Sequence, residues 1–314
     1  MKRLYVFISD LLTAKGNKRN LIDSCFENGA YGIRFFLCHI GGRGKNLQPF
    51  KRVGWYEHPE VPGVKFPVYD LRIPNPTYYR RLKRIIKFIK ANDGLILCSL
   101  HDFCSLKGNK TVKYYHPFVC SVQAFETSGG VWGEQMKRWH ARYFREIIEF
   151  LNAQGVKYEF EGMSEYDAKD WDDATMIDWH KWAIDELVKL GISKCNIVAS
   201  AMRNYSQIAS QAGYYSIHGI VRPNNLGDFD YKPHPQLIIS GDGGTDGEGT
   251  PDAKGRKGVS LPHSKQIAHR INHMNYAGYE YMDRGLWNPD NDNANLDNFD
   301  PSILAAMAKI FSKA

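Results

Sequence analysis

The chain alternates short apolar runs with amphipathic stretches of helical period, a pattern typical of repeated strand–helix units. Eight apolar runs are predicted strands: Leu4–Ser9, Gly32–Cys38, Leu95–His101, Lys157–Met163, Asn196–Ala201, Tyr214–Gly219, Gln236–Gly241 and Tyr279–Asp283. Seven stretches are predicted helices: Lys18–Asn28, Thr77–Asn92, Gly133–Gln154, Thr175–Leu190, Ser206–Ala212, His263–Tyr276 and Pro301–Lys313. Several of them are followed by glycine, as expected of helix C-caps.

Eight strands separated by helices in 314 residues predict an α/β fold, a (β/α)8 TIM barrel that forms a single domain over residues 1–314. No helix is predicted before the seventh strand, where Arg222–Pro235 is rich in Pro, Asn, Gly and Asp. The alternative is a doubly wound open sheet. That fold needs a glycine-rich phosphate turn after the first strand, and Ser9–Leu12 is not one.

Long loops are expected after the second and third strands, at His39–Pro76 and Asp102–Trp132. Both follow the carboxyl ends of strands, the face at which barrel enzymes build their sites. Six aromatic residues in these loops predict an aromatic-lined cleft: Trp55, Tyr56, Tyr114, Tyr115, Phe118 and Trp132. For any one of them, the alternative is that it packs its loop against the barrel.

The composition is that of a globular protein, with 43% hydrophobic residues and no apolar run near the roughly 18 residues of a membrane helix. We therefore expect a soluble protein without a membrane partner. The net charge of +7 divides into +13 over residues 1–113 and −6 over residues 114–314. A basic stretch, Tyr78–Lys90, has an apolar opposite side and is predicted to be an outer helix with a solvated face, so no nucleic-acid partner is expected.

Six cysteines lie far apart, and no CxxC pair occurs, so neither a zinc nor a redox motif is predicted. We expect the cysteines to act as small hydrophobic residues. No cofactor is implied, and we expect a monomer. No signal peptide is visible, because Met1 leads directly into the first predicted strand; this leaves the compartment undetermined.

Polar residues mark the ends of several predicted strands. Arg34 lies inside the apolar run Ile33–Leu37, where a charge is costly unless a carboxylate pairs with it, so it is predicted to face an acid in the barrel mouth. Other strands end in or near His101, His218, Glu165 and Asp242. Two acids on either side of a bond are the arrangement used for glycoside hydrolysis.

Three segments resemble clan A glycoside hydrolases, closest in pattern to the family 5 cellulase and mannanase group: Asn28–Arg34 (NGAYGIR), Leu97–Asp102 (LCSLHD) and Tyr158–Glu165 (YEFEGMSE). The resemblance implies that Glu165 is the acid/base and that Arg34 orients the nucleophile. It further implies that His101 and His218 line the catalytic centre. The nucleophile is expected at the end of the seventh strand, where this chain has Asp242.

The chain departs from the family pattern at four positions. Ser164 replaces the Asn before the acid/base, Asp242 replaces a Glu, and Ile220 stands where a Tyr is usual. The Trp expected at the end of the eighth strand is absent there, and Trp287 follows a few residues later. Because Asp is one methylene shorter than Glu, two alternative second carboxylates stay open, Glu248 and Glu280.

The favoured interpretation is a retaining, endo-acting glycosidase of β-linked polysaccharides or oligosaccharides, in which Glu165 protonates the leaving oxygen and Asp242 attacks the anomeric carbon. One alternative is a catalytically silent carbohydrate-binding barrel. Another is a metal-dependent hydrolase that uses His101, Asp102, His218 and Asp242. Basic residues in the first long loop predict a preference for anionic glycans: Arg43, Lys45, Lys51 and Arg52.

Overall fold

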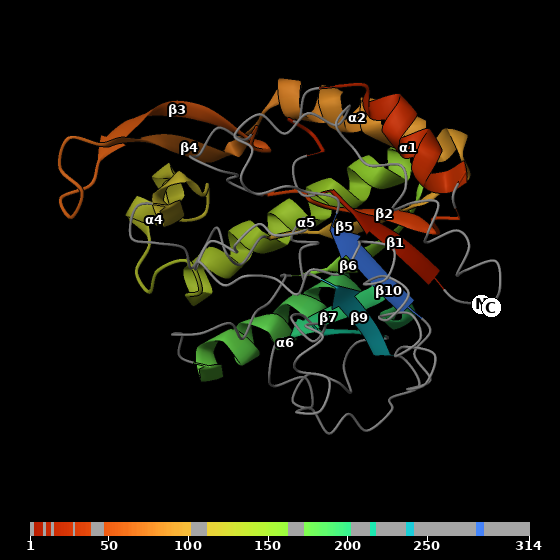
Figure 1. Cartoon of the computed structure of the whole chain (residues 1–314). Helices are drawn as coiled ribbons and strands as arrows, with labels where there is room; N and C mark the ends of the chain where they lie inside the picture. The colour runs from red at the N-terminus through yellow and green to blue at the C-terminus, as the bar shows by residue number, and fades with distance from the viewer. Residues whose placement is uncertain are drawn as a thin grey trace, which may run out of the picture.

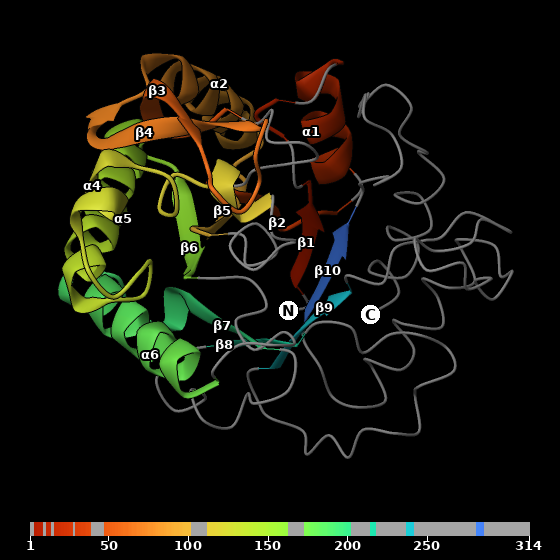
Figure 2. The same cartoon turned by 90° about the vertical axis from the view of Figure 1, so that its left-hand side faces the viewer.

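Eight parallel strands pair edge to edge in a closed ring. In chain order they are β1 (Arg3–Phe7), β2 (Gly32–Phe36), β5 (Leu95–Ser99), β6 (Lys157–Glu161), β7 (Ile197–Ala201), β8 (Tyr214–Ile217), β9 (Leu237–Gly241) and β10 (Tyr281–Gly285). β1 pairs with β2 on one side and with β10 on the other, and Figure 2 looks into this ring. Each strand begins and ends within two residues of a predicted run, so the strand predictions are confirmed.

The computed structural model describes residues 3–8, 11–13, 16–27, 29–38, 47–101, 112–162, 173–201, 214–217, 237–241 and 281–285. Three predicted helices lie outside these residues: Ser206–Ala212, His263–Tyr276 and Pro301–Lys313. The α/β architecture with a parallel sheet is therefore observed, whereas the extent of a single domain over residues 1–314 stays a prediction. Among the described helices, none is long and apolar enough to cross a membrane.

Four helices lie outside the ring (Figure 2): α1 (Lys18–Glu27), α2 (Pro76–Ala91), α5 (Glu134–Gln154) and α6 (Asp173–Lys189). In α2 the apolar side, which includes Leu82, Ile85 and Ile89, is buried, and its lysines and arginines are exposed. The predicted outer helix with a basic solvent face is thus confirmed. The Asn75 side chain caps α2 by accepting a hydrogen bond from the Thr77 amide at 3.1 Å.

Successive side chains of the barrel strands alternate between two packing environments, as the period of two in a strand requires. Ile33, Phe35 and Phe160 belong to the large core that includes the buried faces of the helices. Tyr5, Leu97 and Val198 belong to a separate, smaller cluster. Ser99 lies two residues after Leu97 and therefore on the same side of β5. Arg34, Glu159 and Glu161 are direct neighbours of the outward residues Ile33, Phe35 and Phe160, so they point to the inside of the ring.

The first long insertion is not the loop that the sequence predicts. It contains an antiparallel hairpin of β3 (Phe50–Glu57) and β4 (Lys65–Pro74), which extends beyond the barrel (Figure 1). The second insertion adds two short helices, η2 (Val112–Tyr115) and α4 (Val122–Glu126), and a 3-10 turn, η3 (Lys194–Asn196), precedes β7. The hairpin was missed because Pro67 and Pro74 interrupt its strand pattern, and proline is tolerated at sheet edges.

The aromatic residues of the insertions are divided between core and surface. Phe118 is 0% exposed and Tyr114 is 7% exposed, so these two follow the alternative in which the residue packs its loop. Tyr114 packs with Phe66 and Cys120 in a small core under the hairpin. Trp55, by contrast, is 56% exposed. The two insertions therefore have a hydrophobic core of their own.

Gly32 in β2 is held in a position where no side chain fits. A Cβ atom there would lie 2.8 Å from the Leu95 carbonyl oxygen and 3.0 Å from the Tyr5 ring. We expect Gly32→Ala to lower the free energy of unfolding by about 1–3 kcal/mol, because the barrel must shift to accept the methyl group. Urea unfolding measures this. Gly54→Ala in β3 is the control, since nothing lies within 4 Å of its Cβ position; equal stability of the two variants would contradict the prediction.

Candidate active site

Arg34 forms a buried ion pair with Glu161, the last residue of β6. Its Nε and Nη2 atoms donate to Glu161 Oε2 at 3.1 and 2.8 Å, and the two side chains are 1% and 0% exposed. The prediction that Arg34 faces a carboxylate is therefore confirmed. The sequence did not identify Glu161 as that partner.

Ser99, the last residue of β5, completes this cluster. Its hydroxyl donates to the same Glu161 oxygen and accepts from Arg34 Nε at 3.2 Å. Ser99 and Glu161 are register partners on β5 and β6, and β2 lies on the other side of β5. The three neighbouring strands β2, β5 and β6 thus bring a guanidinium and a carboxylate together inside the ring. The low dielectric there strengthens their attraction, and removing either partner is costly.

A second buried acid, Glu159, lies two residues before Glu161 on the same face of β6. The Tyr5 hydroxyl donates a hydrogen bond to Glu159 Oε2, and the two residues are 0% and 2% exposed. The spacing of Glu159 and Glu161 by two residues in an apolar strand was the sequence signal for two inward acids. Sequence reasoning gave neither of them a role.

His101 follows β5 and belongs to an ordered chain of hydrogen bonds. His140 Nε2 lies 3.0 Å from the Val131 carbonyl oxygen, and His140 Nδ1 lies 3.1 Å from His101 Nε2. A carbonyl oxygen only accepts, so His140 carries its proton on Nε2 and its Nδ1 accepts the proton of His101 Nε2. The remaining His101 atom, Nδ1, keeps its lone pair and has no hydrogen-bond partner among the described residues.

Both imidazoles are held neutral at pH 7. Burial lowers the pKa of His101 well below its usual 6.5, and the neighbouring His140 and His116 lower it further. Burial also lowers the pKa of His140 to about 3, although its bond to the Val131 carbonyl opposes this shift. His140 stacks on Phe118 with ring centroids 4.1 Å apart. Sequence reasoning missed His140, because it lies on α5, far from any strand end.

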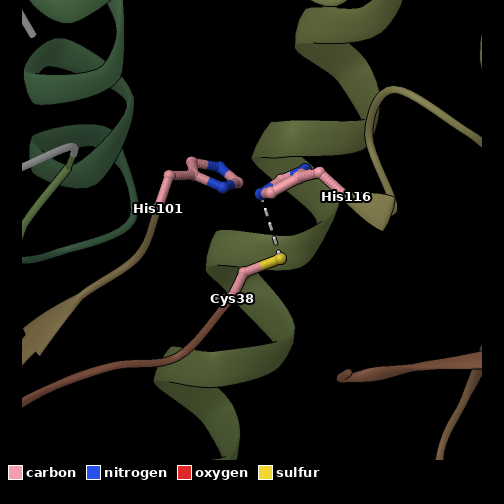
Figure 3. A group of neighbouring side chains, drawn as sticks. All are labelled: Cys38, His101 and His116. Atoms are coloured by element: carbon pink, nitrogen blue, oxygen red, sulfur yellow. Dashed lines mark hydrogen bonds between the residues drawn. The ribbon is translucent and has the colours of Figure 1, made fainter. Parts of the chain in front are cut away.

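Cys38, His101 and His116 come together from three segments (Figure 3). Cys38 follows β2, His101 follows β5 and His116 follows η2, and all three are buried. Cys38 Sγ lies 3.4 Å from His116 Nε2 and 3.5 Å from Gln48 Oε1. Cys38 therefore has polar contacts that go beyond the expected role of a small hydrophobic residue. Cys25 fits that role, because burial raises the pKa of its thiol to about 12.

Only two predicted site residues, Arg34 and His101, lie in the part of the chain that the structure describes. The others lie outside it: Glu165, Asp242, Ser164, His218, Trp287, Glu248 and Glu280. Contact between Arg34 and Asp242 thus stays a prediction, and the described acidic partner of Arg34 is Glu161. Ser99, Glu161 and His140 are the residues that the fold adds to the predicted set.

The fold is shared with known carbohydrate-active enzymes. A family 5 cellulase of Bacteroidetes affiliation superposes with a TM-score of 0.58 and 8% identity over 99% of this chain and 91% of its own. A β-mannanase from Streptomyces thermolilacinus gives 0.54 and 13% over 99% and 91%. The fold is that of the family 5 glycoside hydrolases.

A Bacteroides vulgatus protein that is provisionally designated a glycoside hydrolase gives a TM-score of 0.62 and 12% identity over 98% of this chain. This chain spans only 56% of that longer protein. No protein-family model and no curated protein matches the sequence. At these identities the likeness establishes the architecture of the chain, and its chemistry must be argued from its own residues.

The buried pair of Arg34 and Glu161 gives a stability prediction. We expect Arg34→Met to lower the free energy of unfolding by about 3–5 kcal/mol, because it removes the guanidinium that donates two hydrogen bonds to the buried Glu161 carboxylate. The double variant R34M/E161L removes both charges and should recover most of this loss in urea unfolding. Lys157→Met is the control, because Lys157 and its partner Asp93 are 61% and 88% exposed, and its cost should be about 0–1 kcal/mol. A double variant no more stable than R34M would contradict the prediction.

The neutral histidines give a pH prediction. His101 and His140 have lowered pKa values in the folded protein, so the unfolded chain binds protons that the folded chain does not once the pH falls below about 6.5. Their stability contribution is therefore complete above that pH and is lost toward pH 3. We expect His140→Gln to reduce the slope of unfolding free energy against pH by about 1.4 kcal/mol per pH unit between pH 4 and 5.5. An unchanged slope would show that His140 is already protonated in the folded protein.

Proposed function

We propose that the protein is a glycoside hydrolase that cleaves β-linked polysaccharides or oligosaccharides. The observation that carries this proposal is the buried cluster of Arg34, Ser99 and Glu161 in a barrel of the family 5 fold. Ser99 and Glu161 end their strands, and the carboxyl ends of strands are where barrels of this kind place their sites. Because buried charge contributes little net stability, a role in building the site accounts for it better.

Glu165 is the proposed acid/base. It follows Glu161 by four residues in the segment that resembles the family's acid/base motif. We propose that Arg34 and Ser99 hold the Glu161 carboxylate in place. Because Glu161 is the last residue of β6, this also holds the strand end that precedes Glu165 in the sequence. In this assignment Arg34 is a positioning residue.

Asp242 is the proposed nucleophile, one residue beyond the end of β9. Glu165 donates its proton to the glycosidic oxygen as the bond to the anomeric carbon breaks, and Asp242 forms an ester with that carbon. Water then attacks the glycosyl-enzyme, giving a proton to Glu165 and releasing Asp242, so the anomeric configuration is retained. Glu248 and Glu280 are the alternative second carboxylates. The proposal includes a monomeric (β/α)8 domain over residues 1–314.

The hairpin β3–β4 provides an exposed surface suited to sugars. Trp55 is 56% exposed, and the Arg52 guanidinium lies 4.4 Å from the centre of its ring. The guanidinium lies over the ring, so the pair presents a cation next to the exposed remainder of the aromatic surface, which suits a sugar that carries a carboxylate or sulfate. Lys51 is exposed on the same strand, so we propose a preference for anionic glycans; Arg43 and Lys45 lie outside the described residues.

The assignment of Glu165 is tested by measuring reducing ends released from a panel of neutral glucans and mannans and of uronic-acid and sulfated polymers. We expect Glu165→Gln to lower kcat on the best substrate by about 10²–10⁴-fold. The loss of kcat/KM should be much smaller on an aryl glycoside, because kcat/KM reports formation of the glycosyl-enzyme and this leaving group needs no proton. Asp242→Asn should impair both substrates. Glu134→Gln, at an exposed position (85%), is the matched control and should retain full activity.

The outcomes separate the alternatives. Full loss in Glu248→Gln or Glu280→Gln, with Asp242→Asn active, would move the nucleophile. Cleavage of no panel member by the wild-type protein, together with glycan binding, would favour a silent binding barrel. A product whose anomeric configuration is inverted in NMR spectra would exclude the retaining mechanism. Preferential cleavage of neutral polymers would contradict the proposed preference for anionic glycans. Loss of hydrolysis on chelation would favour a metal-dependent hydrolase.

A further inference from the structure

We propose that Cys38, His101 and His116 form a binding site for a thiophilic divalent cation such as Zn²⁺. Their ligand atoms all lie within 4.8 Å of one another, and all three side chains are buried. Thiolate and imidazole are the ligands that Zn²⁺ prefers, and three protein ligands leave one position of its tetrahedron for water or another donor. This proposal does not depend on glycosidase activity.

The spacing of Cys38 and His116 already suits an ion. Their Sγ and Nε2 atoms are 3.4 Å apart, whereas a tetrahedral ion with bonds of about 2.3 Å to sulfur and 2.0–2.1 Å to nitrogen holds such a pair about 3.6 Å apart. His101 would close on them by a movement on the order of 1 Å. The three residues come from the ends of β2 and β5 and from the second insertion (Figure 3), so a bound ion would tie that insertion to the barrel.

His101 has a buried nitrogen lone pair that no described residue engages. Its Nδ1 atom is buried and has no hydrogen-bond partner among the described residues, while its Nε2 proton goes to His140. Metal-binding histidines characteristically donate their second ring proton to a neighbouring acceptor, which fixes the ring and its tautomer. Here His140, anchored on the Val131 carbonyl, is that acceptor. Burial keeps His101 neutral and thus able to bind an ion.

His116 and Cys38 must rearrange their protons. His116 Nδ1 accepts from the Phe118 amide at 3.2 Å, so without an ion the proton lies on Nε2 and faces Cys38. Binding moves that proton to Nδ1, which breaks the hydrogen bond from the Phe118 amide and requires the ring or that amide to turn away, because two donors would otherwise face each other. Binding also releases the Cys38 thiol proton to solvent. Each divalent cation therefore displaces one proton, and all three protein bonds to the ion come from neutral nitrogen or thiolate sulfur. Gln48, 3.5 Å from Cys38 Sγ, can turn its amide NH2 group toward the thiolate.

The test titrates the whole purified chain, freed of metal with a chelator that is then removed, with Co²⁺ and then Zn²⁺ at pH 7.5. We expect one Co²⁺ per chain, a thiolate-to-cobalt charge-transfer band, the intense visible bands of a tetrahedral ion, and loss of all of them when Zn²⁺ is added. One proton per ion should be released in weakly buffered solution. Zn²⁺ should also raise the melting temperature.

The variants decide between this site and adventitious binding. Cys38→Ser and His116→Gln should lower the affinity at least 10-fold, and Cys38→Ser should remove the charge-transfer band. His140→Gln should weaken binding about 10–100-fold, as the loss of a supporting residue does. Cys195→Ser removes an exposed thiol, and His58→Gln removes a histidine of the hairpin; both should bind as the wild-type chain does.

Each other result overturns the proposal. Absence of stoichiometric binding, or wild-type affinity in folded Cys38→Ser and His116→Gln chains, would refute the site. Binding lost in Cys195→Ser but kept in Cys38→Ser would place the ion at the surface. Circular dichroism and urea unfolding establish that the variants fold, and if Cys38→Ser does not, His116→Gln decides. Hydrolysis is not measured, so this result is independent of the proposed glycosidase.

Discussion

The pairing of Arg34 with Glu161 is the constraint that ties together three neighbouring strands of the barrel, β2, β5 and β6. A guanidinium at 1% exposure needs a counter-charge, because leaving one member of a buried ion pair alone costs about 3–5 kcal/mol. The strands that provide its partners must therefore stay in register, and Ser99 and Glu161 do lie opposite each other on β5 and β6. A slip of one residue would turn Glu161 out of the ring and break its ion pair with Arg34. The ion pair thus contributes to the specificity of the strand register.

A second constraint determines which ring nitrogens of His101 and His140 carry protons. The Val131 carbonyl fixes the tautomer of His140, and His140 fixes that of His101. The aromatic surroundings, with Phe118 stacked on His140, make the uncharged state of both rings the stable one. The result is an imidazole lone pair held at the end of β5. The cation proposal draws on this lone pair.

The two insertions are structured elements, and they change the environment of the strand ends. The hairpin β3–β4 and the segment around η2 pack on each other through Phe66 and Tyr114, and the second segment also supplies His116 and Phe118. Residues from a single extended stretch of sequence therefore serve two purposes: some form the local core, and others reach the strand ends. Trp55 and Arg52 stay on the surface of the hairpin, where they are accessible to a ligand.

The sequence by itself determined the strand order, four of the described helices and the need of Arg34 for an acid, because periodicity and the cost of buried charge act locally along the chain. It could not determine that Glu161 is this acid, that β3 and β4 pair, or that Cys38 meets His101 and His116. Each of these contacts joins residues that are far apart in the sequence, and no pattern in the sequence links them. Spacing motifs such as CxxC detect only residues that are close in the chain. Closing a ring of parallel strands brings such residues together, so only the tertiary structure decided them.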